Sequence, residues 1–287
     1  MMEPGLLPRR KPDMHKGDAG RVLLLCGSVG LSGAAALCAM GALRSGAGLV
    51  TLGIPNSLHH PMVEKLTEAM FLVLPETKEG SLSAQALPDI LRAVQRVDAV
   101  AIGPGLSQQP QTKELVRQLL PAVTKPLVLD ADGLNALADD VGLLKKLPLP
   151  IVLTPHPGEM GRLMRLSSEE VQQDRERIAR EFAKTYHVVL VLKGHRTVVA
   201  NFDGTLCVND TGNPGMATGG SGDVLTGMIA GLLGQQLSLF DAARLGVYLH
   251  GVAGDLAAAE RGEIGLIASD LVDRIPLAIR HYQQLSH

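Results

Sequence analysis

The chain has 287 residues, of which 32 are glycine, 4 phenylalanine, 3 tyrosine and none tryptophan, and 46% of its residues are hydrophobic. This balance is typical of a globular protein with a sizeable core and excludes a disordered chain. The 27 basic and 29 acidic residues give a formal net charge of -2, so no general basic field exists to gather nucleic acid or an anionic membrane surface, and the few aromatic side chains offer little for base stacking.

The cysteines and the start of the chain predict a cytoplasmic protein. Cys26, Cys38 and Cys207 have neither disulfide nor metal-ligand spacing, so we interpret them as small hydrophobic residues in a reducing compartment. No apolar signal-peptide core follows the first charged residues. The uncharged stretch 22–43 is interrupted by glycine and serine, which favours a strand, loop and helix over a membrane span.

Short apolar runs that alternate with helical patterns predict a layered α/β fold. Most of the runs are continuously apolar, as in parallel strands covered on both faces. The predicted strands are residues 22–26, 49–54, 70–74, 99–102, 127–130, 151–154 and 188–192. The predicted helices are residues 34–45, 84–95, 112–120 and 167–186, and each crossover is long enough for a right-handed βαβ unit.

The pattern of predicted elements changes in the C-terminal third. Asp203-Gly204 predicts a hairpin between residues 197–200 and 205–208, and helices are expected at 223–233, 240–259 and 268–284. No linker-like composition and no internal repeat divides the chain. We therefore expect an N-terminal extension of residues 1–13 and one domain at 14–287.

The glycine loop of residues 212–222 carries the strongest functional signal. Five of its eleven residues are glycine and a helix follows, so unpaired N–H groups and the positive end of the helix dipole would meet there, an arrangement that favours a phosphate. Asp223 in the first helical turn could take a proton from an attacking hydroxyl. The alternative is that Asp223 only caps the helix.

Two further glycine loops follow predicted strands. The spacing Gly27, Gly30, Gly33 is GxxGxxG, and no acidic residue ends the second strand, which disfavours a dinucleotide-binding Rossmann motif; a P-loop motif is absent too. Ligand contact and simple close packing are equally good readings of this loop. Gly103-Pro104-Gly105 also ends a strand, but the same residues form ordinary tight turns.

Polar groups end three more strands. Asp130 and Asp132 could bind magnesium or cap a helix. His156 is held between two prolines, which indicates a ligand contact, whereas Glu159 could be a helix-start carboxylate. Lys193 would bring an ammonium near phosphates, or would belong to a solvated hairpin tip. Because these loops lie at carboxyl ends of parallel strands or open a helix, we expect them to converge on one cleft.

These segments resemble one known family. Residues 211–223 and 154–159, supported by 16–18, 44–50 and the KGxxT segment at 193–197, look like the ADP-dependent NAD(P)H-hydrate dehydratases, a ribokinase-like family of nicotinamide nucleotide repair. The resemblance covers about residues 14–285. Ser221 stands where the family often has threonine and keeps the hydroxyl.

The resemblance implies a fold and a reaction. The fold is a ribokinase-like three-layer sandwich with a central, mainly parallel sheet flanked by helices. The substrate is the S form of hydrated NADH or NADPH, whose hydroxyl is phosphorylated by ADP, or by ATP in some members, before phosphate leaves to regenerate the dihydronicotinamide. ADP would give AMP, and Mg²⁺ is the expected cofactor, with no protein ligands assigned.

The resemblance also assigns residues. Asp223 would be the catalytic base, and the backbone from Gly219 to Gly222, with Gly220 and Gly222 at its centre, would stabilise the transferring phosphoryl. The nucleotide would be held by Lys193, Gly194, His195, Arg196, Thr197 and Gly222. The hydrated dinucleotide would be held by Ala35, Gly105, His156 and Asp223.

Rival functions and partners remain open at this point. The alternatives are a small-molecule kinase of the hydroxyethylthiazole or pyridoxal type, and a nucleotide sensor without catalysis. The resemblance implies self-association into a homo-oligomer such as a tetramer. Relatives are often fused to an epimerase domain, and none precedes residue 14, so we expect the chain to act beside a separate epimerase.

Overall fold

The computed structural model describes residues 5–285, and one sheet organises them. Its strands are β1 (Arg21–Leu25), β2 (Leu49–Pro55), β3 (Met70–Leu74), β4 (Ala99–Ile102), β5 (Leu127–Leu129), β6 (Val152–Leu153), β7 (Val189–Leu192), β8 (Val198–Ala200) and β9 (Leu206–Val208). They lie in the order β3-β2-β1-β4-β5-β6-β7-β8-β9. β1 to β7 are parallel, and the antiparallel β8 and β9 form the hairpin predicted at Asp203-Gly204.

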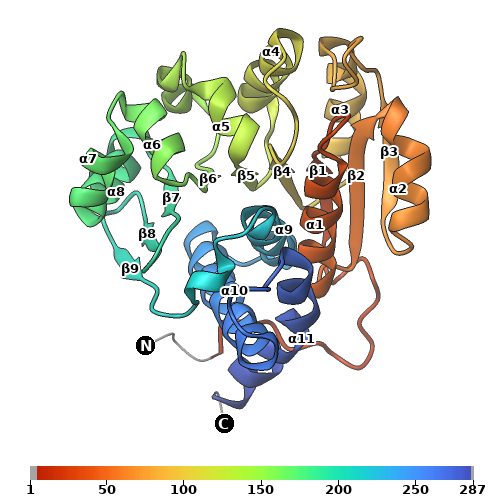
Figure 1. Ribbon diagram of the computed structural model, residues 1–287. Coiled ribbons are helices and arrows are strands. Elements are labelled where there is room, and N and C mark those ends of the chain that lie inside the picture. Colours follow the sequence, from red (N-terminus) through yellow and green to blue (C-terminus); the bar gives the residue numbers. More distant parts are fainter. Residues whose placement is uncertain (1–4, 286–287) are drawn as a thin grey trace.

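Helices cover both faces of this sheet (Figure 1). They are α1 (Ser32–Arg44), α2 (His59–Lys65), α3 (Leu87–Val94), α4 (Pro110–Leu119), α5 (Ala131–Leu137), α6 (Pro157–Met164), α7 (Ser168–Gln173), α8 (Arg175–Tyr186), α9 (Ser221–Gly234), α10 (Leu239–Arg261) and α11 (Ala268–Gln284). One core lies between the sheet and α1, α2, α9, α10 and α11, and a second lies between the sheet and α3 to α8. The predicted α/β sandwich of three layers is confirmed.

Alternation along the central strands produces these two cores. Val22 and Leu24 of β1 contact the α1 and α9 side, whereas Leu23 and Leu25 contact the α4 side, and all four are buried. Neighbouring residues of a strand point to opposite faces, so a strand covered on both sides must be apolar throughout. This explains why the central strands lack polar residues.

The helices differ from the prediction in two ways. The predicted helix 167–186 is two helices, because Asp174 leaves helical geometry (φ -146°, ψ 60°) and its side chain accepts a hydrogen bond from the Arg177 amide to start α8. A capping box formed by Ser167 and Glu170 begins α7. Three short helices, α2, α5 and α6, were not predicted, since each has only seven or eight residues.

The strand order reverses between β1 and β4. From β1 the chain proceeds outward to β2 and β3, and it then returns to place β4 on the other side of β1. The loops after β1 and β4 lead to α1 and α4, which lie on opposite faces of the sheet. Such a switch point opens a crevice at the carboxyl ends of the strands, where ligands of open α/β sheets bind.

Glycines let α9 lie directly against α1. A Cβ atom on Gly227 would lie 1.9 Å from the Cys38 carbonyl oxygen, and one on Gly41 would lie 2.3 Å from the Val224 carbonyl oxygen. No side chain larger than hydrogen fits either position without moving the helices apart. This contact fixes α9 beneath the sheet and sets where its first turn emerges.

The remaining sequence predictions concern the termini and membrane segments. The expected extension 1–13 begins with four residues outside the described part, but the Leu6 amide donates to the Tyr282 hydroxyl of α11 at 3.1 Å. Residues 22–43 form β1, a loop and α1, as predicted. Within residues 5–285, no helix combines the length and apolar character needed to cross a membrane. Cys26 and Cys38 are buried, Cys207 is partly buried, and all three are free thiols.

We predict that Gly227→Ala destabilises the fold. Its Cβ would overlap the backbone of α1, and overpacking of this kind costs about 1–3 kcal/mol, more than the gain in helix propensity. The thermal midpoint should fall. Gly265→Ala is the control, because a Cβ there meets nothing within 4 Å; equal midpoints for the two variants would contradict the assigned helix contact.

Candidate active site

Two glycine loops meet at the switch point. The Gly27 amide donates to the Pro104 carbonyl at 2.8 Å, and Ser28 Oγ donates to the Gly105 carbonyl at 2.8 Å. Gly105 has a φ of 64°, and a Cβ on it would lie 2.9 Å from that of Ala34. The loops after β1 and β4 therefore form one continuous backbone surface, as their positions at strand ends predicted.

The third glycine loop ends at the first turn of α9. Gly220 is the N-cap residue in the left-handed region (φ 91°, ψ -13°), and no side chain caps the helix. Within residues 5–285, the amides of Gly219, Gly220, Gly222 and Asp223 donate to no protein acceptor. Free N–H groups at a helix N-terminus attract an anion.

Side chains of α10 form hydrogen bonds with the backbone of this loop. Asp255 accepts hydrogen bonds from the Gly212 amide at 2.9 Å and from Asn213 Nδ2 at 3.0 Å. His250 Nε2 lies 3.0 Å from the Ser221 carbonyl oxygen. Burial lowers the pKa of His250 to about 4, so the ring is neutral and donates to that carbonyl at ordinary pH. Sequence reasoning missed both residues, since each stands alone within an ordinary helix.

Asp223 stands beside the free amides. It does not cap α9, because Gly220 holds that position and no side-chain cap exists. Burial, followed by the negative charge of Asp130, raises its pKa to about 7, although the ammonium of Lys193 acts in the opposite direction. A carboxylate with a pKa near the operating pH is suited to general-base catalysis. The helix-cap alternative is therefore wrong.

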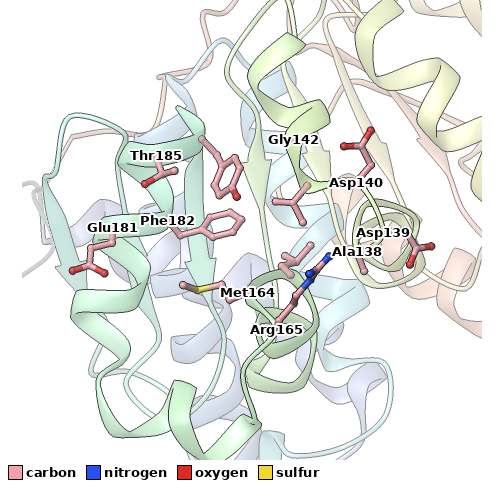
Figure 2. A pocket seen from close by; sticks show the side chains of 12 residues that line it. Ala138, Asp139, Asp140, Gly142, Met164, Arg165, Glu181, Phe182 and Thr185 are labelled. Atoms are coloured by element: carbon pink, nitrogen blue, oxygen red, sulfur yellow. The ribbon is translucent and has the colours of Figure 1, made fainter.

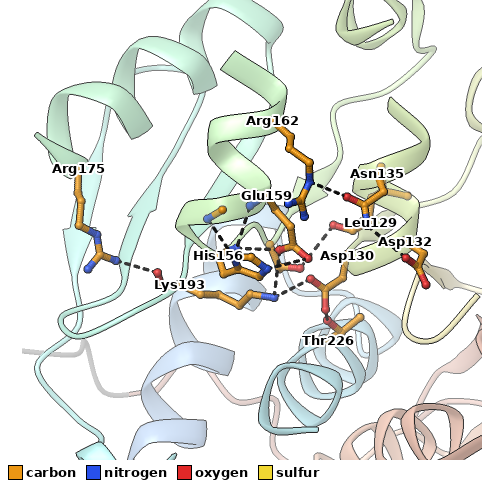
Figure 3. Close-up of polar contacts among 12 residues, drawn as sticks. Leu129, Asp130, Asp132, Asn135, His156, Glu159, Arg162, Arg175, Lys193 and Thr226 are labelled. Atoms are coloured by element: carbon orange, nitrogen blue, oxygen red, sulfur yellow. Dashed lines mark hydrogen bonds and ion pairs between the residues drawn. The ribbon is translucent and has the colours of Figure 1, made fainter. Parts of the chain in front are cut away.

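A buried ionic cluster of Lys193, Asp130 and Glu159 acts electrostatically on Asp223, and Figure 3 shows the contacts within this cluster. Lys193 Nζ is 2.7 Å from Asp130 Oδ1 and 3.8 Å from Glu159 Oε2. Burial alone would lower the pKa of Lys193, but the charges of Asp130 and Glu159 outweigh burial and raise it. Burial also raises the pKa of Glu159, against the effect of Lys193. The lysine is thus a permanent internal cation.

Lys193 is oriented differently from the rest of its segment. Its side chain is 18% exposed and points inward, and a Cβ on Gly222 would lie 3.3 Å from its Nζ, so the ammonium adjoins the glycine loop. The solvated-tip alternative fails for this residue. Gly194, His195 and Arg196 are exposed, and Arg196 pairs with Asp210 at 3.0 Å.

The backbone of that segment is fixed by an arginine. Arg175 of α8 donates to the carbonyl oxygens of Leu192, Lys193 and His195 at distances from 2.6 to 3.1 Å. Thr197 Oγ1 donates to the Gly194 carbonyl at 2.9 Å. The predicted nucleotide-binding segment is therefore a rigid, exposed turn, and its contact with a nucleotide stays a prediction.

His156 is the N-cap of α6. Its Nδ1 accepts hydrogen bonds from the amides of Gly158 and Glu159, and Glu159 Oε2 accepts one from the His156 amide at 2.8 Å. The helix-start role considered for Glu159 is confirmed. Burial and the charge of Lys193 lower the pKa of His156. The ring is about half exposed, so its predicted contact with substrate remains open to test.

Four more residues singled out from the sequence are Ala35, Gly105, Asp130 and Asp132. Ala35 is fully buried in α1, and Gly105 is buried with its carbonyl engaged by Ser28. Asp132 accepts the Ser107 amide at 2.9 Å and Asn135 Nδ2 at 3.2 Å. Asp130 occupies an N-cap position but makes no cap bond. The contacts predicted for Ala35 and Gly105 with the substrate stay predictions.

The described residues contain no group of three histidine, cysteine or acidic side chains arranged to hold a metal ion. The oxygens of Asp130 and Glu159 are taken by Lys193, Thr226 and a backbone amide. Within residues 5–285 the side chains alone therefore offer no prebuilt metal cage.

A surface cavity lies elsewhere. A cavity of about 560 Å³ opens between the ends of α5 and α6 and the last turns of α8, with Phe182 and Tyr186 along one side (Figure 2). None of the predicted site residues lines it. Because the chemistry requires the free amides and Asp223, we place the site at α9 and not in this cavity.

Comparisons with known proteins identify the family of this chain. The family model described as NAD(P)H-hydrate dehydratase matches residues 22–277. The chain belongs to this family. It is 35% identical to the ADP/ATP-dependent NAD(P)H-hydrate dehydratase from Bacillus subtilis, co-crystallised with ATP and Mg²⁺, with a TM-score of 0.81 over 96% of this chain and 94% of that one. The resemblance inferred from the sequence is confirmed.

Relatives of this family extend further than the present chain. The chain is 52% identical over 278 residues to the bifunctional NAD(P)H-hydrate repair enzyme Nnr from Moorella thermoacetica, and the match covers 97% of the chain but 52% of that enzyme. It spans about half the length of the curated relatives it matches. A hydroxyethylthiazole kinase from Pyrococcus horikoshii, 13% identical with a TM-score of 0.62, shares the fold alone.

We predict that ionisation of Asp223 lowers the stability of the folded protein. Its folded pKa of about 7 lies above its ordinary value of 3.8, so the unfolded chain loses this proton first and native stability falls as pH rises from about 4 to about 7. Asp223→Asn should therefore melt above wild type at pH 8, and the difference should shrink toward pH 4. A constant difference across this range would show that the carboxyl has no raised pKa.

Proposed function

We propose that this chain dehydrates the S form of hydrated NADH or NADPH, with ADP or ATP as the phosphoryl donor. The observation that carries the proposal is the placement of Asp223, a carboxylate with a pKa of about 7, between uncapped amides and a fixed ammonium at the switch point of the sheet. Family membership selects the substrate class, and the site geometry supplies the chemistry.

The proposed reaction has two stages. Asp223 takes the proton of the substrate hydroxyl while the oxygen of that hydroxyl attacks the terminal phosphoryl group of the nucleotide. The amides of Gly219, Gly220 and Gly222 stabilise the charge on the transferring group. AMP leaves when ADP is the donor. The new carbon–oxygen–phosphorus link then breaks at the carbon–oxygen bond, a proton leaves the adjacent carbon, and the dihydronicotinamide and orthophosphate are formed.

The proposed ligand positions are those that the family resemblance implies. The nucleotide would lie along Lys193, Gly194, His195, Arg196 and Thr197, with its phosphates toward Gly222. The hydrated nicotinamide would lie near Gly105 and His156, close to Asp223, with Ala35 bordering it through backbone. The Lys193 ammonium, held by Asp130, would offset phosphate charge without moving.

Mg²⁺ remains part of the proposal as a companion of the nucleotide. It would neutralise phosphate oxygens, as such ions do in phosphoryl transfer. The Bacillus subtilis relative was co-crystallised with ATP and Mg²⁺. Because no prebuilt cage exists among the described side chains, we expect the ion to arrive with the nucleotide and assign it no protein ligand.

The kinase alternative is disfavoured by the family match, and intact Asp223 argues against a sensor without catalysis. A cytoplasmic location, self-association into a homo-oligomer such as a tetramer, and action beside a separate epimerase stay predictions. So does the division into a 1–13 extension and a domain at 14–287.

The direct assay offers chemically hydrated NADH with Mg²⁺ and either ADP or ATP. We expect the absorbance of reduced nicotinamide to recover, with a rate that falls as pH drops through about 7 because Asp223 must be ionised. Asp223→Asn should lose turnover by about 100-fold or more while still binding nucleotide. Turnover of a thiazole or pyridoxal alcohol, with no recovery of NADH, would instead establish the kinase alternative.

A further inference from the structure

The Asp130 carboxylate joins two elements that carry the proposed chemistry. It lies directly after β5 and is 1% exposed. Its Oδ1 accepts a hydrogen bond from Lys193 Nζ at 2.7 Å, and its Oδ2 accepts one from Thr226 Oγ1 at 2.6 Å (Figure 3). Both distances are those of strong hydrogen bonds to an ionised group.

The two partners of Asp130, Thr226 and Lys193, relate it to Asp223 and to Gly222. Thr226 lies three residues after Asp223 on α9, and residues at this spacing share one face of a helix. The bond to Thr226 therefore fixes how α9 is rotated about its axis, and with it the direction of the Asp223 side chain. Lys193 follows β7 directly and adjoins Gly222 in the first turn of α9.

We propose that Asp130 is a positioning residue, which holds the Lys193 ammonium and the Asp223-bearing turn of α9 in one fixed arrangement and places a negative charge beside the base. This inference rests on the proposed function, since it assigns a role within the same site. It also explains why a carboxylate lies in the protein core, where burial of an apolar residue would cost less free energy.

The charges around Asp223 support this role. The groups that act on Asp223 are Asp130 after β5, Asp132 in the first turn of α5, Glu159 of α6, Lys193 after β7, and the Cys38 thiol of α1. After burial, Asp130 contributes most to the raised pKa of Asp223, and Lys193 opposes it. Removal of the Asp130 charge must therefore lower the pKa of Asp223.

The first test is Asp130→Asn, with Asp139→Asn as a control that removes an equal charge from an exposed position after α5. Glu159 remains as counterion for Lys193. We expect the acidic limb of the pH–rate profile to move down by about one pH unit in Asp130→Asn, and to stay in place in the control. An unmoved limb in a folded Asp130→Asn protein would overturn the proposal.

The second test separates geometry from charge. Thr226→Val removes the hydroxyl and keeps the Asp130 charge, so kcat should fall about tenfold while the acidic limb stays in place. Thr226→Ser restores the hydroxyl and should recover kcat. Loss of kcat in both variants to the same degree would mean that packing, and not the hydrogen bond, matters, which contradicts the positioning role.

A third measurement does not depend on turnover. The carboxyl stretch of Asp223 is followed by infrared difference spectroscopy against Asp223→Asn, as a function of pH, in wild type and in Asp130→Asn. The midpoint should be near 7 in wild type and lower in the variant. Equal midpoints overturn the proposal even if the wild type acts on a different substrate, whereas shifted midpoints in a protein without dehydratase activity refute only the proposed function.

Discussion

The direct backbone contact between α1 and α9 is the constraint on which the site depends. Gly227 and Gly41 let the two helices approach until carbonyl oxygens occupy the space of missing side chains. With α9 fixed against α1, its first turn adjoins Leu37 of α1 at Gly220 and Lys193, the residue after β7, at Gly222. The glycine-rich composition of the chain therefore serves helix packing as much as ligand approach.

Electrostatics at this helix end are balanced and not simply positive. The uncapped amides of α9 and the Lys193 ammonium favour an anion, while Asp130, Asp132 and Glu159 surround Asp223 with negative charge. A base must hold its proton weakly enough to be ionised and strongly enough to take another proton. The opposing charges keep Asp223 in that range, and Asp130 contributes twice, through its own charge and through its hold on Lys193.

Much of this arrangement could be predicted from the sequence, because it follows from local patterns. Continuous apolar runs predicted the strands, and the five glycines before Asp223 predicted the loop that leads into the uncapped first turn of α9. The relations between distant residues could not be predicted. Nothing near Asp130 indicates that its partners are Lys193, 63 residues away, and Thr226, 96 residues away. Likewise His250 and Asp255 support the loop from one long helix whose sequence carries no motif. The prolines around His156 indicated rigidity correctly, but the cap of α6 accounts for part of it.

In the proposed reaction the substrate hydroxyl attacks a phosphoryl group at the first turn of α9 and departs as phosphate. Hydrated NADH prepared in ¹⁸O-enriched water carries the label in this hydroxyl, and mass spectrometry of the products after turnover with ADP locates it. We expect the label in orthophosphate, in step with the AMP and NADH formed. Label released into water, with unlabelled orthophosphate, would contradict phosphorylation of the hydroxyl and with it the role assigned to Asp223.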